Sequence, residues 1–111
     1  MEPERAAAVN IVEREGKRAI VLQGAADIFF AADLRQAALA LLEGGEDIPV
    51  YCEKLERLDT STLQILLALK RELEQKGKKL RVIELPSEPT RLVGLAGLTS
   101  HLIQEYRHAN E

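Results

Sequence analysis

The chain has 111 residues, which is enough for one domain with a hydrophobic core but not for two independent domains. Its net charge of −3 and its pI near 5.5 argue against a nucleic-acid binder, because such proteins use a basic surplus to neutralise phosphates. No stretch approaches the roughly 18 apolar residues of a membrane span, and the acidic first residues do not resemble a signal peptide. We therefore expect a cytoplasmic protein that binds no nucleic acid and does not insert directly into a membrane.

Aliphatic residues have to build the core, because only 4% of the residues are aromatic. The single cysteine, Cys52, cannot form an internal disulfide and lies in an apolar stretch. We expect it to be a small buried side chain rather than a reactive thiol, which is compatible with a reducing compartment.

Periodicity and turn residues predict an N-terminal hairpin of two strands, followed by helices and strands in alternation. Gly16 follows the first strand, and glycines at 44, 45 and 77 follow helical patterns, as C-terminal glycines do. In chain order we expect strands at 9–13 and 19–22, a helix at 32–42, a strand at 48–52, a helix at 61–75, a strand at 80–85 and a helix from Ser87 or Pro89 to Ala96. This order predicts an α/β sandwich with a mixed sheet, in a single domain over residues 1–111 whose first residues, 1–7, are frayed. The pattern at 101–111 indicates no definite structure.

A polar segment lies where the predicted strand at 48–52 leads into the longest predicted helix. Residues 58–63 read Leu-Asp-Thr-Ser-Thr-Leu. Asp, Thr and Ser are helix-capping residues, because their side-chain oxygens accept hydrogen bonds from the unpaired amides of the first turn. The same amides, together with the positive end of the helix dipole, tolerate an added anion such as a phosphate. On these residues alone, the segment is either a plain helix cap or a phosphate site.

Four segments, in matching order and spacing, resemble the STAS domain family of the anti-sigma factor antagonist type. Residues 22–27 (LQGAAD) are similar to the family's L-x-G-x-x-D, residues 58–63 (LDTSTL) to its I-D-[ST]-[ST]-G-L, residues 77–82 (GKKLRV) to the strand that follows its second helix, and residues 93–98 (VGLAGL) to its final L-x-x-x-G-L. The resemblance covers nearly the whole chain. It implies a STAS-like sandwich in which three or more helices pack on a mixed sheet of four to five strands.

The resemblance also implies a function. In the family, a partner kinase phosphorylates the first hydroxyl after the Asp, which is Thr60 here, and Ser61 is either a backup acceptor or a structural cap. Asp59 and Asp27 match acidic residues that the family places around the phosphosite. The implied function is a protein-binding module that exchanges partners on phosphorylation. Those partners are an anti-sigma factor, a serine/threonine kinase or another regulatory protein, and no cofactor is implied.

The start of the helix at 61–75 is the expected partner interface, formed by Thr62, Leu63, Gln64 and Leu67. Here the chain departs from the family, since Thr62 replaces a glycine and Gln64 replaces a small residue. The added bulk either reshapes the interface for a different partner or accompanies a loss of phosphorylation.

The same helix has an apolar arc of roughly 200°, wider than the roughly 100° stripe of an ordinary surface helix. The arc contains Leu63, Ile65, Leu66, Leu67, Leu69 and Leu73. Either the helix is deeply buried between its neighbours, or an apolar edge stays open to a partner or to a second copy in a homodimer.

Other classes of function find less support in the sequence. Neither His101 nor His108 lies in a nucleophile motif, and there is no glycine-rich phosphate loop or metal-spaced cluster, so we expect no enzyme and no metal site. The alternative is a non-phosphorylated accessory subunit. Resembling domains serve in lipid-transport ATP-binding cassette complexes, with an Asp-Thr at the same junction, and beside chemotaxis or two-component proteins.

Overall fold

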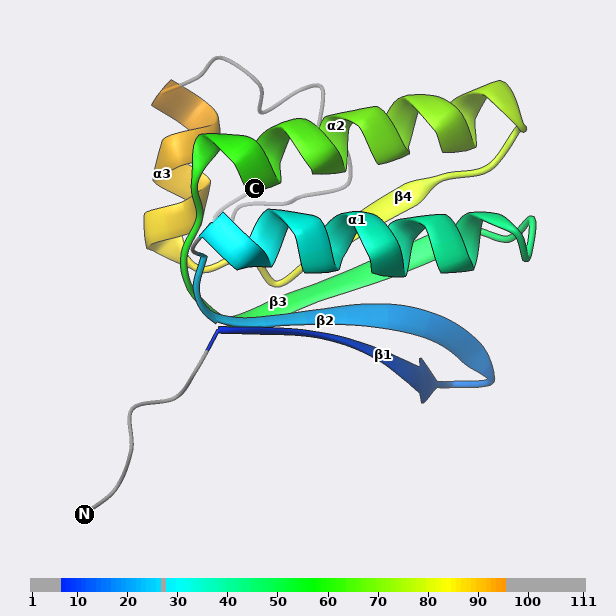
Figure 1. The fold of residues 1–111 in the computed structure, drawn as a ribbon, viewed down its shortest axis with the longest axis horizontal. Coiled ribbons are helices and arrows are strands. Elements are labelled where there is room, and N and C mark those ends of the chain that lie inside the picture. Colours follow the sequence, from blue (N-terminus) through cyan, green and yellow to red (C-terminus); the bar gives the residue numbers. More distant parts are fainter. Residues whose placement is uncertain (1–6, 27, 96–111) are drawn as a thin grey trace, which may run out of the picture.

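The computed structural model describes residues 7–26 and 28–95, and these form one sheet with three helices (Figure 1). In chain order the elements are β1 (Ala8–Arg14), β2 (Lys17–Ala25), α1 (Ile28–Leu42), β3 (Ile48–Arg57), α2 (Thr60–Gln75), β4 (Leu80–Ile83) and α3 (Ser87–Leu95). The sheet has four strands in the order β1-β2-β3-β4. The predicted α/β sandwich with a mixed sheet is confirmed. The predictions for residues 1–6 and 96–111 lie outside the described residues.

Strands β1 and β2 form the predicted hairpin. They pair in antiparallel register from Ala8 opposite Gln23 to Arg14 opposite Lys17. Glu15 and Gly16 connect the two strands with φ values of 54° and 78°. A two-residue type I′ turn, whose twist matches that of the strands, requires a positive φ at both positions. Gly16 adopts this conformation without a steric penalty because it has no Cβ.

The other two strand pairs, β2–β3 and β3–β4, are parallel, and each is connected through a helix. Because both crossovers advance in the same direction along the sheet, the usual right-handed connection places both helices on one face. Figure 1 shows α1 and α2 side by side on that face, running in the same direction, with α3 across the end where both helices begin. This arrangement puts the start of α2 at an edge of the molecule.

The core lies between this face of the sheet and the helices, and it is almost entirely aliphatic, as predicted. Phe30 is the one aromatic residue among the buried hydrophobic residues of the described chain, with 2% of its surface exposed. The core side chains that α2 contributes are Leu63, Leu66, Leu69 and Leu73. No helix of the described chain is long and apolar enough to cross a membrane.

Three elements are longer than predicted by three residues or more, and one is shorter. Strand β2 spans Lys17–Ala25 instead of 19–22, because it pairs with β1 on one side and with β3 on the other, and β4 ends at Ile83 instead of 85.

Strand β3 continues past the predicted end at Cys52 to Arg57, because its second half pairs with β2, where Gly24 lies opposite Leu55 and Ala25 opposite Arg57. The charged sequence of that half lacks a strand pattern, so hydrogen bonding to β2 outweighs local preference. Helix α1 begins at Ile28 instead of 32, since burial of Phe30 fixes its first turn.

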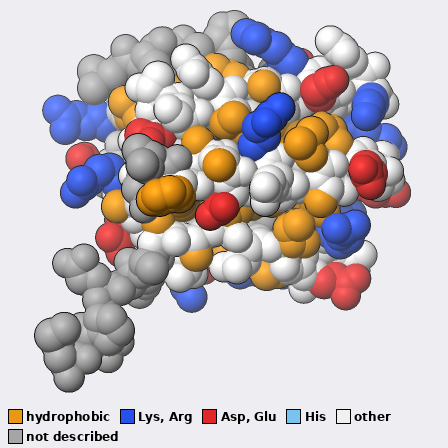
Figure 2. Space-filling view, in the orientation of Figure 1, with side chains coloured by type: hydrophobic (Ala, Val, Ile, Leu, Met, Phe, Trp, Pro, Cys, Tyr) orange, Lys and Arg blue, Asp and Glu red, His pale blue; other side chains and the backbone are white. Residues whose placement is uncertain are grey.

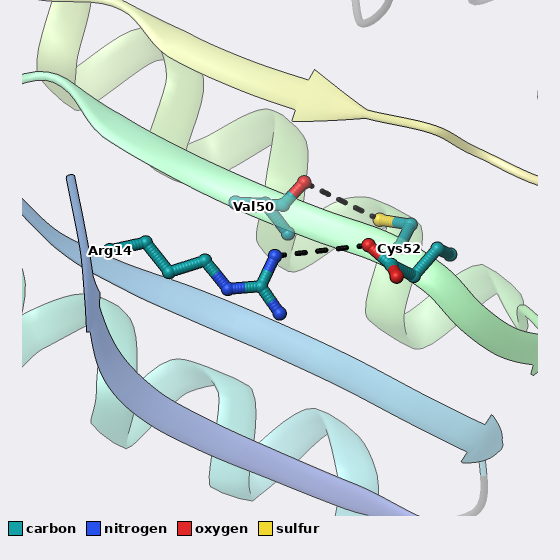
Figure 3. Close-up of polar contacts among 4 residues, drawn as sticks. Arg14, Val50 and Cys52 are labelled. Carbon is teal, nitrogen blue, oxygen red and sulfur yellow. Dashed lines mark hydrogen bonds and ion pairs between the residues drawn. The ribbon is translucent and has the colours of Figure 1, made fainter.

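On the opposite face of the sheet, Arg14 reaches from β1 to β3 (Figure 3). Its guanidinium lies 4.2 Å from the ring centroid of Tyr51 and 3.8 Å from the carboxylate of Glu53. A cation over an aromatic ring with an anion beside it links an edge strand to a central one, although exposed contacts of this kind stabilise weakly.

Cys52 is fully buried in the core, as predicted, and its thiol donates a weak hydrogen bond to the Val50 carbonyl at 3.7 Å (Figure 3). Burial raises the pKa of this thiol from 9.0 to about 12, because the thiolate would lose its hydration. The reactive form of a cysteine is the thiolate. This thiol is therefore protected from reagents, because it is buried and because it stays protonated.

We predict that Cys52 reacts with a thiol reagent only when the protein unfolds. The free energy of unfolding should fall as pH rises above 9, where the unfolded thiol ionises while the folded one stays protonated. Denaturant titrations at increasing pH on the wild type and on Cys52→Ala measure this effect, which the variant should lack. Rapid labelling of the native protein would contradict the buried position.

Candidate functional site

Asp59 caps the N-terminus of α2. Its backbone is extended, with φ of −117° and ψ of 171°, and its side chain accepts a hydrogen bond of 2.9 Å from the Thr62 amide. Its carbonyl oxygen accepts the first helical bond from the Leu63 amide at 3.0 Å. Both features define an N-cap residue. The capping role predicted for this segment therefore belongs to Asp59.

The two hydroxyls after the cap are left available. Thr60 and Ser61 are both exposed on the first turn of α2, and within the described chain neither side chain makes a hydrogen bond. Since Asp59 already binds the Thr62 amide, the fold does not need these hydroxyls for capping. Both are sterically open to a modifying enzyme, and the backbone amides of the first turn lie beside them.

The surroundings of Thr60 come from the ends of two parallel strands and from α3. The Ala26 amide donates to the Arg57 carbonyl at 2.9 Å, so the end of β2 lies beside the end of β3. The next residue, Asp27, lies outside the described residues, and its predicted place near the phosphosite stays a prediction. The carboxyl ends of parallel strands, with a helix beginning there, are the usual place for binding sites in such sheets.

A surface hollow of about 200 Å³ borders the junction between β3 and α2. It is lined by Arg57, Leu58, Glu88, Arg91 and Leu92. Arg91 and Glu88 are both exposed and form an ion pair at 3.8 Å. Neither arginine of this hollow was predicted as a site residue, because the strand pattern ends at Cys52 and periodicity does not show that α3 packs beside β3.

Thr62 is in the interior. It has no exposed surface, and among the described residues its hydroxyl oxygen has no hydrogen-bond partner. The bulk that replaces the family's glycine therefore points into the core and does not obstruct the surface. A buried hydroxyl without a partner costs free energy. The hydroxyl of Thr62 therefore lowers the free energy of unfolding relative to an apolar side chain of the same size.

The expected interface divides into buried and accessible residues. Thr62 and Leu63 are buried, so their side chains lie beneath the surface and would not touch a partner docked on this conformation. The partner interface as a whole stays a prediction, with these two side chains beneath its surface. Gln64 is exposed and Leu67 is half-buried, and both are accessible.

The described residues hold no group of three or more His, Cys, Asp or Glu side chains that could bind a metal ion. Both histidines of the chain, at 101 and 108, lie outside the described residues. The accessible polar groups at this end of the described chain include the Thr60 and Ser61 hydroxyls, the helix amides, two arginines and Glu88.

We predict that Asp59→Ala lowers the free energy of unfolding by about 1 kcal/mol, the usual value of an N-cap, because the Thr62 amide loses its acceptor. Thr60→Ala is the matched control and should change stability by less than about 0.5 kcal/mol, since Thr60 is exposed. Urea denaturation followed by circular dichroism measures both values. Equal losses in the two variants would assign part of the cap to Thr60.

We also predict that Thr62→Val stabilises the protein by roughly 1 kcal/mol, because a methyl group replaces a buried hydroxyl that lacks a partner. Thr62→Ser keeps the hydroxyl and removes the methyl group, so it should destabilise the protein. Thermal and urea unfolding compare the three proteins. A loss of stability in Thr62→Val would mean that the hydroxyl has an acceptor in solution.

Comparison with known proteins supports the assignment of the fold. A profile of the family described as "Mlab, STAS domain" matches residues 10–104. An anti-sigma factor antagonist from Mycobacterium paratuberculosis has a similar structure, with a TM-score of 0.73 and 18% identity over 99% of this chain and 93% of that chain. Comparison with curated protein sequences gives no match.

Two structures of the anti-sigma factor antagonist SpoIIAA are also similar. The unphosphorylated form gives a TM-score of 0.67 and 24% identity over 84% of this chain and 82% of that chain. The phosphorylated form, from Bacillus, gives 0.60 and 24% identity over 95% of each chain. At these identities the likeness shows a common fold. The profile match spans most of the sequence, and the chain belongs to the STAS domain family.

Proposed function

We propose that this protein is a protein-binding regulatory module of the anti-sigma factor antagonist type, and that phosphorylation of Thr60 switches its binding. The observation that carries the proposal is the separation of roles at the start of α2. Asp59 caps the helix, and the Thr60 hydroxyl is exposed beside it. SpoIIAA, which has a similar fold, is known in both unphosphorylated and phosphorylated forms.

The helix start lets the domain tolerate a phosphate. Phosphorylation adds about −1.5 to −2 charges. At the first residue of α2 this charge lies at the positive end of the helix dipole, near amides that lack helical partners. Arg57 lines the neighbouring hollow and adds positive charge nearby, whereas the charge of Arg91 is paired there with Glu88. The folded domain therefore keeps its stability when it is modified.

A bound partner does not have the same tolerance. A protein docked over Thr60, Gln64 and Leu67 would cover the modified side chain and remove its water. Burying the phosphate costs several kcal/mol when the docked surface brings no positive charge of its own to replace the lost water. The same modification thus leaves the domain folded and releases the partner, which is the behaviour that a partner-switching protein requires. The partner in this proposal is an anti-sigma factor or a serine/threonine kinase.

The second candidate is a permanent accessory subunit of a larger complex, such as a lipid-transport ATP-binding cassette complex, without phosphorylation. Phe29 favours it, because 69% of this aromatic side chain is exposed on the first turn of α1. The first turns of α1 and α2 lie at the same end of the molecule (Figure 1). Aromatic residues at such positions often anchor stable interfaces.

We predict that Thr60→Glu weakens binding to the anti-sigma factor or kinase encoded near its gene by at least about tenfold, because it places a charge in the interface. Thr60→Gln has the same size without the charge and is the matched control, and Thr60→Ala should bind like the wild type. Calorimetric titration measures the affinities, and mass spectrometry of protein from the native host tests for phosphate on Thr60.

Equal affinities for the Glu and Gln variants would exclude a charge-operated switch. If Thr60 also carries no phosphate in the host and Phe29→Ala weakens the complex strongly, the accessory-subunit role is the better description.

A further inference from the structure

An apolar groove runs between the outer surfaces of α1 and α2, separate from the proposed phosphosite. Its lining residues are Arg35, Ala38, Leu39, Leu42, Ile65, Ala68, Leu69 and Glu72. The buried side chains of Ala38 and Leu69 form the floor, and 51% of Leu39 is exposed on its wall. Six of the eight lining residues are apolar, and the other two carry opposite charges.

Exposed apolar residues also lie around the groove, beside polar ones such as Gln36 and Arg71. Residues 29, 32, 39 and 40 of α1 are a phenylalanine, two alanines and a leucine, and all four are exposed. Ala68 of α2 is exposed as well. In Figure 2, hydrophobic side chains extend across the face formed by the two helices, with charged side chains between and around them. Apolar side chains that gather on one face are a common feature of interaction sites.

The two charges occupy diagonally opposite corners of the groove. The helices run in the same direction (Figure 1), and the lining residues advance together, from Arg35 to Leu42 on α1 and from Ile65 to Glu72 on α2. Arg35 is therefore at the first end of the groove on one helix, and Glu72 is at the last end on the other. Both are exposed.

A surface with one cation and one anion at opposite corners is complementary to itself under a two-fold rotation. When the axis lies in the surface, perpendicular to the line that joins the two charges, the rotation exchanges their positions. Each Arg35 then faces Glu72 of the partner subunit, and the two ion pairs flank an apolar centre. We propose that this groove is the interface of a symmetric homodimer.

Helix geometry gives the crossing angle of this dimer. Seven residues along a helix span about 10 Å, and packed helices lie about 8–10 Å apart, so the diagonal makes an angle of roughly 45° with the helices. The two-fold axis is perpendicular to this diagonal, so it also makes an angle of roughly 45° with the helices. The helix pairs of the two subunits therefore cross at roughly a right angle, and Leu39 of each subunit lies over the apolar centre.

The test is the oligomeric state of the full chain without any other protein. Sedimentation velocity should show a monomer–dimer equilibrium between low micromolar concentration and about 1 mM, the range expected for a small interface. Leu39→Glu should weaken the dimer by at least about tenfold, because it places a charge at the centre. An unchanged melting temperature shows that this exposed substitution leaves the fold intact.

A charge exchange tests the predicted pairing. Arg35→Glu and Glu72→Arg should each weaken the dimer by roughly tenfold, since each substitution creates two like-charge contacts. The double variant Arg35→Glu/Glu72→Arg should restore the wild-type affinity. Lys54→Glu, an exposed substitution on β3, is the control and should leave the dimer unchanged.

A chain that stays monomeric throughout this concentration range would overturn the proposal. So would a dimer that the single charge variants do not weaken, or one that the double exchange does not restore. The measurements need neither kinase nor phosphate, and their outcome is therefore independent of the switch proposed at Thr60.

Discussion

The parallel pairing of β2, β3 and β4 in chain order is the constraint on which the rest of the molecule depends. Each parallel pair requires a crossover through a helix, and the common direction of the two crossovers places α1 and α2 on one face of the sheet. Both helices therefore start at the same edge and run side by side. The shared starting edge exposes the start of α2 at Thr60. The side-by-side packing leaves the apolar groove between the two helices.

Three of the four consecutive polar residues at that edge, 59–62, have different roles because their side chains point in different directions. Asp59 precedes the helix and binds an amide of the first turn, whereas the side chain of Thr62 points into the core. Thr60 lies between them and points to solvent. A hydroxyl that neither caps nor packs contributes little to stability, so it can be modified or mutated without loss of the fold. The proposed switch and the helix cap are thus separated within four residues.

The sequence predicted the parts of the fold that depend on local signals. Alternation, Gly16 and Gly77 located the hairpin and the end of α2, and the leucine periodicity of α2 located its buried face. It did not predict that β3 extends to Arg57, because the charged second half of that strand is held by pairing with β2. The hollow beside Thr60 was missed for the same reason, since it requires the packing of α3 against β3.

The position of α1 determines which part of the wide apolar arc of α2 is buried. Leu63, Leu66, Leu69 and Leu73 are buried, while Ile65 on one side of them is half-buried and lines the groove with α1. The sequence left open whether the arc was fully buried or partly open, because periodicity gives the width of an apolar face but not the position of the neighbouring helix. The structure shows that one edge of the arc borders a groove.

The two surfaces on α2 are far enough apart to act independently. Thr60 and Glu72 are twelve residues apart, which is about 18 Å along the helix axis. The Debye length at physiological ionic strength is about 8 Å, so a phosphate on Thr60 is largely screened from the ion pair proposed at Glu72. Ile65, the nearest groove residue on α2, is uncharged and does not respond to that charge. In these two proposals, one helix presents a charge-operated surface at its start and a constitutive apolar surface over residues 65–72.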